Sequence, residues 1–224
     1  MQKIIVAIDG FASTGKSSLA KRLAETLNYT YIDSGAMYRA VTYFAIQKGH
    51  QGHIDQEKLI AKLDQIEIYF KYSKQGHQTF LNGLNISKEI RLSEVTEQVS
   101  RVSKILEVRS LLVTQQQKLG AKKGIIMDGR DIGTVVFPKA ECKFFLKASS
   151  EIRAKRRHLE QIEAGNNESF ASVLSNIKVR DLMDTTRKLS PLKKADDAIE
   201  IDVSEMSLEE VYHQLLEHIS KKII

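Results

Sequence analysis

The sequence predicts an α/β protein with a central parallel sheet, and three observations support this prediction. Short apolar runs alternate along the chain with stretches of helical periodicity, which is the order of repeated βα units. The apolar run at residues 3–9 leads directly into GFASTGKS at residues 10–17, which fits the pattern G-x-x-x-x-G-K-[ST]. A helical pattern follows, and a strand, a glycine-rich turn and a helix in this order let backbone N–H groups converge on a phosphate. We therefore expect a three-layer P-loop core on a parallel sheet of about five strands.

The P-loop predicts the first ligands of this core. Lys16 is expected to lie along the β- and γ-phosphates of a nucleoside triphosphate, and the Ser17 hydroxyl is expected to bind Mg²⁺. Gly10 and Gly15 supply the turn geometry and the close backbone approach that side chains would obstruct. The alternative is a βα turn that carries GKS by chance, and the strand before the loop and the helix after it argue against that interpretation.

Composition limits the class of protein without deciding its ligand. The 224 residues can form one α/β domain with small insertions, and their net charge of +6 suits either nucleic acid or a site for several phosphates. The single cysteine, Cys142, excludes an intramolecular disulfide, and the apolar run around it favours buried packing over a catalytic role. The chain has no charged leader before an apolar segment and no apolar stretch of membrane-spanning length, so it is expected in the cytoplasm.

The N-terminal part of the chain predicts further βα alternation. A helix is expected over residues 16–27, a short strand over 29–32, and a second helix from residue 33 to about residue 48 with a polar cap at its start. His50 and His53 follow in a glycine-containing loop. They lack a cysteine or carboxylate set at metal spacing, so a solvated loop is favoured over a pair of metal ligands.

The pattern over residues 66–90 changes from helical to alternating. Apolar and polar residues alternate near its start, a turn-like segment covers residues 73–76, and Asn82-Gly83 is typical of a hairpin turn. These features predict a small antiparallel insert. The insert is interpreted either as a subdomain that closes over a substrate or as a structural decoration, and the pattern leaves both interpretations open.

An acidic residue ends the apolar strand expected at residues 124–128. Asp128 is the second acidic group that a P-loop protein uses to position Mg²⁺, directly or through water. Arg130 and Asp131 follow at once, so a cation and an acceptor are expected at the rim of the sheet, facing the crevice where such sheets bind ligands. A surface Arg–Asp pair is the alternative.

Three arginines lie on one face of the helix expected to begin near residue 149. Arg153, Arg156 and Arg157 have the spacing i, i+3 and i+4, so they repel one another unless an anion lies opposite. A triphosphate or a transferring phosphoryl group would supply that anion. The alternative is a solvated basic face with Glu151 and Glu160 as local partners.

A second charged stripe follows a helix break at Gly165, and the break predicts a lid with a loop tip. The helix expected over residues 168–187 brings Arg180, Asp184 and Arg187 to one stripe that can bind a polar ligand through donors and acceptors. Intrahelical salt bridges are the alternative. The remaining predicted elements are helices over residues 93–101 and 104–119, strands over 142–147 and 198–202, and a closing helix over 207–221.

Together these motifs resemble those of the bacterial cytidylate kinases, in the nucleoside monophosphate (NMP) kinase superfamily, over nearly the whole chain. The P-loop occurs in many families, whereas the DGRDIGTVVFP stretch is typical of a much narrower group of proteins. The segments that carry the resemblance are residues 33–39, 81–83, 89–91, 128–138, 153–157 and 180–192.

The resemblance implies an acceptor site for CMP. Asp131 would accept a hydrogen bond from the cytosine amino group, which uracil lacks. Guanidinium groups would match the oxygens of the CMP phosphate bidentately. The implied residues are Ser34, Arg39, Arg130 and Arg187 for the phosphate, Ser100, Arg109 and Asp131 for the base, and Arg180 and Asp184 for the ribose.

The resemblance also implies an ATP site and a division of the single domain. The family's loop usually continues after its first glycine with proline, serine and a further glycine, where this chain has FAST at residues 11–14. The implied ATP-binding residues are Gly10, Phe11, Ala12, Ser13, Thr14, Gly15, Lys16, Ser17, Ser18, Arg153 and Arg157. The implied catalytic residues are Lys16, Arg130, Arg187, Arg153 and Arg157, with Ser17 and Asp128 for Mg²⁺. The implied regions are a core over about 1–35, 120–150 and 190–224, an NMP-binding region over 36–119 that includes the insert, and a lid over 151–170.

The expected function is transfer of the ATP γ-phosphoryl group to CMP or dCMP, which gives CDP or dCDP and ADP. We expect a monomer that uses Mg²⁺ and binds neither nucleic acid nor a membrane. The nearest alternative is another small-molecule P-loop kinase, such as a thymidylate or shikimate kinase. The alternative from another class is an ATP-dependent RNA-binding regulator, although no aromatic-interleaved basic patch supports it.

Overall fold

The computed structural model describes residues 2–49, 54–73 and 76–223, and its contacts divide the chain into two compact units. The core unit comprises Met1–Ile32 and Leu119–Ile224, and the inserted unit comprises Asp33–Lys118. The predicted loop at His50 and His53, and the middle of the turn at residues 73–76, lie outside the described residues.

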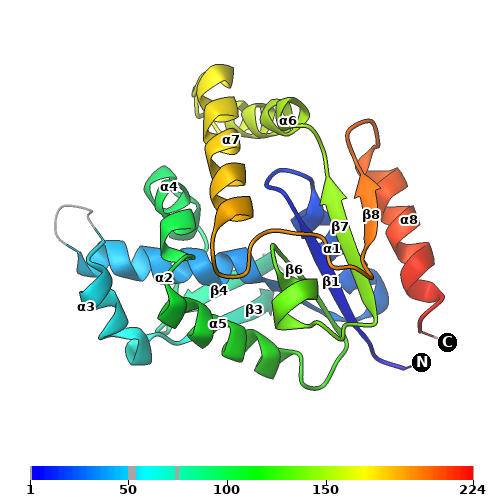
Figure 1. Cartoon of the computed structure of the whole chain (residues 1–224), viewed down its shortest axis with the longest axis horizontal. Coiled ribbons are helices and arrows are strands. Elements are labelled where there is room, and N and C mark those ends of the chain that lie inside the picture. The colour runs from blue at the N-terminus through cyan, green and yellow to red at the C-terminus, as the bar shows by residue number, and fades with distance from the viewer. Residues whose placement is uncertain (1, 50–53, 74–75, 224) are drawn as a thin grey trace. The chain divides into compact units, whose positions relative to one another are not determined.

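The core unit is built on a five-stranded sheet in the order β2-β6-β1-β7-β8 (Figure 1). Strand β1 pairs in parallel with β6 and with β7, and β7 pairs in parallel with β8, which confirms the predicted parallel sheet. The register sets Asp9 beside Gly129, so β1 and β6 end at the same edge. The strands are β1 (Ile5–Gly10), β2 (Thr30–Asp33), β6 (Ile125–Gly129), β7 (Cys142–Lys147) and β8 (Ile199–Asp202).

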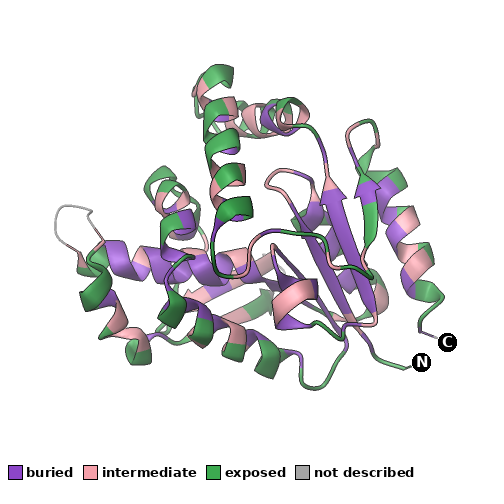
Figure 2. Ribbon diagram, in the orientation of Figure 1, coloured by how far each residue is buried: buried purple, intermediate pink, exposed green. Residues whose placement is uncertain are grey.

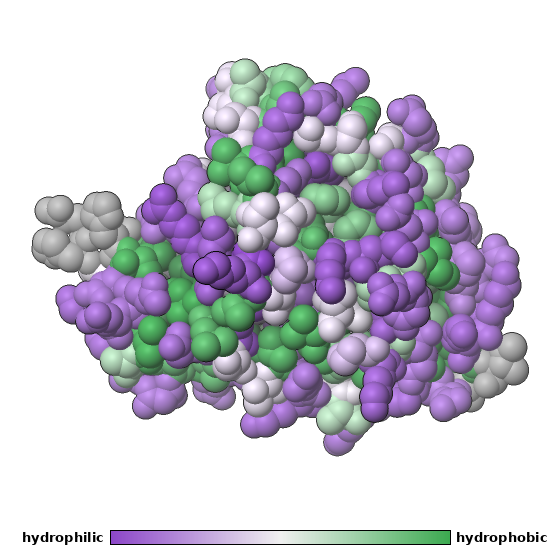
Figure 3. Space-filling view, viewed as in Figure 1, coloured by the Kyte–Doolittle hydropathy of each residue, from purple (hydrophilic) through white to green (hydrophobic). Residues whose placement is uncertain are grey.

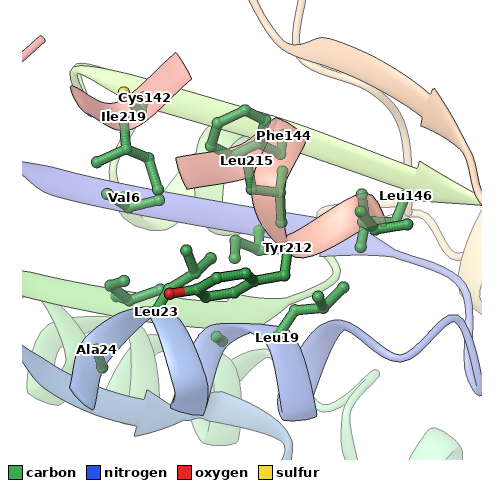
Figure 4. Close-up of a cluster of buried hydrophobic side chains, with 14 of the residues drawn as sticks. Val6, Leu19, Leu23, Ala24, Cys142, Phe144, Leu146, Tyr212, Leu215 and Ile219 are labelled. Carbon is green, nitrogen blue, oxygen red and sulfur yellow. The ribbon is translucent and has the colours of Figure 1, made fainter. Parts of the chain in front are cut away.

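Helices α1 and α8 pack on one face of this sheet (Figure 4). Leu19 and Leu23 of α1 and Leu215 of α8 lie against Val6 and Phe144 of the strands, as the helical periodicity predicts, and all five are at most 2% exposed. Burial of each such side chain is worth about 1.5–3 kcal/mol, so this layer supplies much of the stability of the sheet. The helical segments of the core unit are α1 (Lys16–Leu27), η3 (Ile132–Val136), α6 (Ser150–Glu163), α7 (Phe170–Thr186) and α8 (Leu208–Ser220).

The same apolar layer contains the single cysteine. Cys142 is 6% exposed at the start of β7, and burial raises the pKa of its thiol to about 11. A thiol that stays protonated at neutral pH is a poor nucleophile. The prediction that Cys142 serves packing is therefore confirmed.

Helix α7 is shorter than predicted, because the chain leaves it before Arg187. The backbone of Arg187 is extended (φ −61°, ψ 140°), and its Nε donates to the Ser190 carbonyl at 2.6 Å. Arg187 therefore does not share a helical stripe with Arg180 and Asp184, and this part of the prediction is wrong. The guanidinium instead bonds to the loop that the chain forms as it leaves the helix.

The inserted unit combines helices with a second, antiparallel sheet in the order β3-β4-β5, as the alternating pattern predicts. Asn82 and Gly83 form the turn between β4 and β5 with φ of 49° and 83°. Positive φ at both central residues is what a tight hairpin turn requires. The elements are α2 (Ser34–Lys48), α3 (Gln56–Ile60), η1 (Leu63–Gln65), β3 (Ile68–Ser73), β4 (Gly76–Leu81), β5 (Leu84–Asn85), η2 (Glu89–Arg91), α4 (Ser93–Val102) and α5 (Leu106–Leu119).

Burial follows the elements as expected for two packed units. Figure 2 shows β1, β6 and β7 of the parallel sheet as largely buried, whereas the edge strand β8 and the outer faces of the helices carry exposed residues. Hydrophilic side chains cover much of the face drawn in Figure 3. Among the described helices, none has both the length and the apolar character that a bilayer span requires.

Candidate active site

The P-loop leaves the carboxyl end of β1 through glycines with positive φ. At Gly10 (φ 150°) an added Cβ would lie 2.2 Å from the carbonyl oxygen of Leu146, so a side chain there would collide with β7. Gly15 (φ 82°) precedes α1 and has no side-chain cap. The N-terminal N–H groups of α1 are therefore available to an anion, as the motif predicts.

The rest of the loop folds around its own carbonyl groups. Thr14 Oγ1 and Lys16 Nζ both donate to the Phe11 carbonyl, at 3.0 and 2.7 Å. Ser13 has a positive φ of 59°, and Ser18 is exposed on the first turn of α1. The loop is thus held in its curved form by the side chains of Thr14 and Lys16, of which the motif specifies only Lys16.

Lys16 is a buried cation at 5% exposure. Burial lowers the pKa of its ammonium group to about 7, and the nearby charge of Arg130 lowers it further, while Asp128 and Asp9 oppose these effects. A buried cation held among other cations is characteristic of a site that receives an anion. The charge of Arg180, on α7, also lowers the pKa of Lys16.

Three oxygen-bearing side chains meet beside the loop. Ser17 Oγ donates to Asp128 Oδ2 at 2.7 Å, and the hydroxyl of Tyr31 donates to the other oxygen of Asp128 at 2.9 Å. Mg²⁺ takes oxygen ligands and usually keeps one or two protein groups beside substrate phosphates and water. The described residues contain no cluster of three or more His, Cys, Asp or Glu side chains that would hold a metal by themselves. A hydroxyl and a carboxylate at this distance fit an ion that phosphate oxygens also bind.

The turn after β6 is tied to the end of α7 by two charge pairs. Arg130 Nε donates to Asp184 Oδ2 at 3.0 Å, and Arg187 Nη2 lies 3.8 Å from Asp131 Oδ1. Asp131, Asp184 and Arg187 are at most 8% exposed. The structure therefore brings these four predicted site residues together. It contradicts both a surface Arg–Asp pair and a purely intrahelical partner for Asp184.

The predicted phosphate residues of the inserted unit lie at the start of α2. Asp33 caps this helix by accepting from the Ala36 N–H at 2.7 Å, as the polar opening predicts. Asp33 also pairs with Arg39, at 3.2 Å between Oδ2 and Nη2, and Ser34 beside it is buried. One carboxylate thus fixes both the helix start and the arginine.

The predicted base-binding residues Ser100 and Arg109 are both 4% exposed and share a connection through Ser103. Arg109 Nη1 donates to the Ser103 carbonyl at 3.1 Å, and Ser103 Oγ donates to the Ser100 carbonyl at 3.0 Å. The guanidinium carbon of Arg109 lies 5.3 Å from the ring centroid of Tyr38. Both residues belong to the inserted unit, whereas Asp131 belongs to the core unit.

The head groups of the three arginines of α6 reach different elements in the structure, so their shared helix face does not by itself gather them. Arg153 pairs with Asp181 of α7 at 2.6 Å, and Arg156 Nη2 donates to the Val203 carbonyl at 2.7 Å. Arg157 is half-buried. The alternative, in which Glu151 is a local partner of these arginines, does not hold, because Glu151 pairs with Lys178. A shared helix face orients only the base of each side chain, and the flexible head groups have reached different elements.

Sequence reasoning missed Asp9, a buried carboxylate that directly precedes the first glycine of the P-loop. Its two carboxylate oxygens accept from the N–H groups of Ile132 and Gly133 at 2.8 and 2.7 Å, so it holds the turn that follows Arg130 and Asp131. Burial raises the pKa of Asp9 to about 7, although the two N–H groups act against this rise. An acidic residue at the end of a buried strand was the available signal.

We expect Asp9→Asn to weaken the pH dependence of stability. Because the pKa of Asp9 is about 7 in the fold and 3.8 in its ordinary state, the folded protein binds the additional proton between these values. The free energy of unfolding therefore falls as the pH rises through this range. Asparagine does not titrate, so the variant lacks this decrease. The free energy of unfolding of the wild type should therefore approach that of the variant as the pH rises toward 7. Urea denaturation across this range measures the difference, and a constant difference would contradict the raised pKa.

Comparison with known proteins matches the chain to cytidylate kinases over nearly its whole length. A family model described as cytidylate kinase matches residues 6–221. A cytidylate kinase of Flavobacterium psychrophilum is 52% identical over 221 residues, covering 97% of this chain and 98% of that protein. A cytidylate kinase of Parabacteroides distasonis is 52% identical over 228 residues, covering 100% of this chain and 99% of that protein. A solved gluconokinase from Sinorhizobium meliloti superposes with a TM-score of 0.51 at 14% identity, covering 99% of this chain and 94% of that chain, which is a likeness of fold alone.

Proposed function

The chain belongs to the cytidylate kinase family and is an ATP-dependent CMP kinase, and we propose how its residues divide the transfer of the γ-phosphoryl group from ATP to CMP. The main support within the core unit is an arrangement at the edge of the sheet. The P-loop follows β1, and the turn that bears Arg130 and Asp131 follows the neighbouring strand β6. A donor phosphate site and a cationic acceptor site thus begin at adjacent strand ends.

On the donor side, the P-loop and the N-terminus of α1 bind the phosphates of ATP through backbone N–H groups. Lys16 neutralises the β- and γ-phosphates, and Arg153 and Arg157 of α6 contribute further positive charge. Ser17 and Asp128 would hold Mg²⁺, which supplies charge neutralisation between the phosphates when bound. The hydrogen bond between their oxygens, at 2.7 Å, supports this pairing.

On the acceptor side, Arg130 and Arg187 of the core unit bind the CMP phosphate, and Ser34 and Arg39 of the inserted unit have the same role. Asp131 accepts the amino group of cytosine, with Ser100 and Arg109 as further base contacts. Arg180 and Asp184 hold the ribose. The charge pairs among Arg130, Asp131, Asp184 and Arg187 keep these cations in place before the substrate arrives.

The reaction depends on positioning and on charge neutralisation. The acceptor phosphate is already anionic, so no general base is needed to activate it. The electrostatic obstacle is the approach of two anions, and Lys16, Arg130 and Arg187 offset it. We further propose that residues 36–119 form the NMP-binding region and residues 151–170 a lid that excludes water.

An acceptor panel tests this function. CMP, dCMP, UMP, AMP and dTMP are each offered with ATP and Mg²⁺, and ADP release is followed by a coupled assay. We expect CMP and dCMP to be phosphorylated with kcat/KM at least about a hundredfold above UMP and dTMP, because a buried carboxylate discriminates against bases that lack the amino group. Equal or faster turnover of a non-cytidine acceptor would establish a different small-molecule kinase.

The same proposal includes a cytoplasmic monomer that binds neither nucleic acid nor membranes. In this proposal the net charge of +6 serves to bind the phosphates of the nucleotides. Size-exclusion chromatography with light scattering tests the monomer. Tight, strongly salt-dependent RNA binding without monophosphate kinase activity would favour an RNA-binding regulator instead.

A further inference from the structure

Phe11 gives the P-loop an aromatic ring that contacts two other elements of the core unit. Its ring lies nearly perpendicular to that of Phe145 on β7, with the centroids 6.1 Å apart and an interplanar angle of 80°. The guanidinium carbon of Arg153, on α6, lies 5.0 Å from the centroid of the Phe11 ring. A cation within about 6 Å of an aromatic face is attracted by the ring quadrupole.

The Arg153 guanidinium is fixed on its other sides by hydrogen bonds. Its Nε donates to the Ala148 carbonyl at 2.9 Å, and its two terminal nitrogens donate to the carboxylate of Asp181 at 3.1 and 2.6 Å. A longer contact of 3.4 Å joins it to the Ala12 carbonyl of the P-loop. Arg153 is 3% exposed. One buried guanidinium therefore connects the P-loop, α6 and α7.

A phosphate would compete with the hydrogen bonds that Arg153 donates to Asp181, but not with its contact to the Phe11 ring. Phosphate oxygens compete with Asp181, because both accept from the same terminal N–H groups. The Phe11 ring attracts the cation through its face and occupies no donor. Arg153 can therefore turn N–H groups from Asp181 toward a phosphate while it stays on the ring.

We propose that Phe11 is a positioning residue of the donor site, and that its ring holds the Arg153 guanidinium at the P-loop where the phosphates of the donor nucleotide bind. The inference rests on the proposed function, because it assigns Arg153 to ATP. It adds a cause for the unusual residue that follows the first glycine of the loop. The neutral ring keeps the arginine close without consuming the donors that the phosphates need.

A double-mutant cycle between Phe11 and Arg153 tests the proposal. Phe11→Leu keeps an apolar side chain but removes the aromatic face, and Arg153→Met keeps a similar side-chain length but removes the cation. We expect Phe11→Leu to raise the KM for ATP about tenfold, with the KM for CMP changed by less than about twofold. In the Arg153→Met background, Phe11→Leu should change the KM for ATP by less than about twofold. Phe11→Tyr, which restores the ring face, should recover most of the ATP affinity.

Two controls keep the outcome interpretable. Arg22→Lys removes a guanidinium that lies 3.8 Å from the centroid of the Tyr212 ring, a contact between α1 and α8 to which no substrate role is assigned. It should leave both KM values unchanged. Calorimetric titration with ADP measures donor binding without turnover, and thermal melting reports folding. If Phe11→Leu does not fold, Phe11→Met replaces it in the cycle.

The outcomes separate the two hypotheses. If the wild type phosphorylates CMP but Phe11→Leu weakens ATP equally with and without Arg153, the ring serves only the loop and the proposal is wrong. Equal increases in both KM values, or a Tyr variant as weak as the Leu variant, would also overturn it. If the wild type does not phosphorylate CMP, the proposed function fails, and the ADP titrations still decide whether Phe11 and Arg153 are coupled in nucleotide binding.

Discussion

Replacing Lys16 by Met is expected to lower kcat for CMP phosphorylation by about a thousandfold or more. Lys16 is the buried cation of the P-loop, and its ammonium group is the proposed neutraliser of the charge that develops between donor and acceptor. Methionine has a similar length and no charge. The loss should fall on kcat, measured as ADP release at saturating ATP and CMP, because the missing charge matters most in the transition state.

The same substitution should leave the fold intact. Within the described residues, the side chain of Lys16 donates one hydrogen bond, to the Phe11 carbonyl of its own loop at 2.7 Å, and burial lowers its pKa to about 7, so the fold holds this charge at a cost. Thermal melting of the variant should therefore match or exceed that of the wild type. Lys21→Met removes an exposed lysine from the same helix and serves as the matched control. A Lys16 variant with unimpaired turnover would remove this residue from the mechanism.

The parts of the site that local patterns determine could be predicted from the sequence. The P-loop, the cap at Asp33 and the Asn82-Gly83 hairpin each depend on residues within one turn of chain, where spacing and backbone preference decide the structure. Asp128 belongs with them, because an apolar run that ends in a carboxylate predicts both the strand and the polar group at its end.

The contacts that depend on strand register could not be predicted. Asp9 reaches the N–H groups of Ile132 and Gly133 because β1 and β6 lie side by side in parallel register, and no short-range pattern links positions so distant in sequence. The same holds for Lys143, a buried cation that donates to both oxygens of Asp197 at 2.9 and 2.8 Å. Such pairs follow from the packed fold, and periodicity carries no information about them.

The directions of the arginine head groups on α6 could not be predicted for a related reason. Helical spacing tells which residues share a face, but an arginine head group can reach partners on another element several ångströms away. Arg153 selects the carboxylate of Asp181, and Arg156 selects backbone carbonyls after β8. A buried guanidinium needs partners for its donors, so partner availability in the fold decides its direction.

Replacing Asp131 by Ala is expected to lower kcat/KM for CMP by about a thousandfold and to affect UMP far less. The Asp131 carboxylate is the proposed acceptor for the amino group of cytosine, and uracil presents a carbonyl oxygen at that position. The variant also leaves Arg187 without its neighbour at 3.8 Å, which should slow both substrates equally because Arg187 is assigned to the phosphate. The ratio of the two kcat/KM values therefore isolates the contribution of base recognition from the disturbance of Arg187.

Asp131→Asn supplies the matched variant, because it keeps the size of the side chain and replaces the carboxylate by an amide. The amide still offers one acceptor oxygen to cytosine, and its NH₂ group can donate to the carbonyl of uracil. We expect Asp131→Asn to lower kcat/KM for CMP less than Asp131→Ala does, and to raise kcat/KM for UMP above that of the wild type. The ratio of kcat/KM for CMP to that for UMP should therefore be lower in the Asn variant than in the wild type. The comparison uses kcat/KM for both acceptors in one assay. Equal losses for CMP and UMP in the Ala variant would mean that Asp131 supports Arg187 and does not distinguish the base.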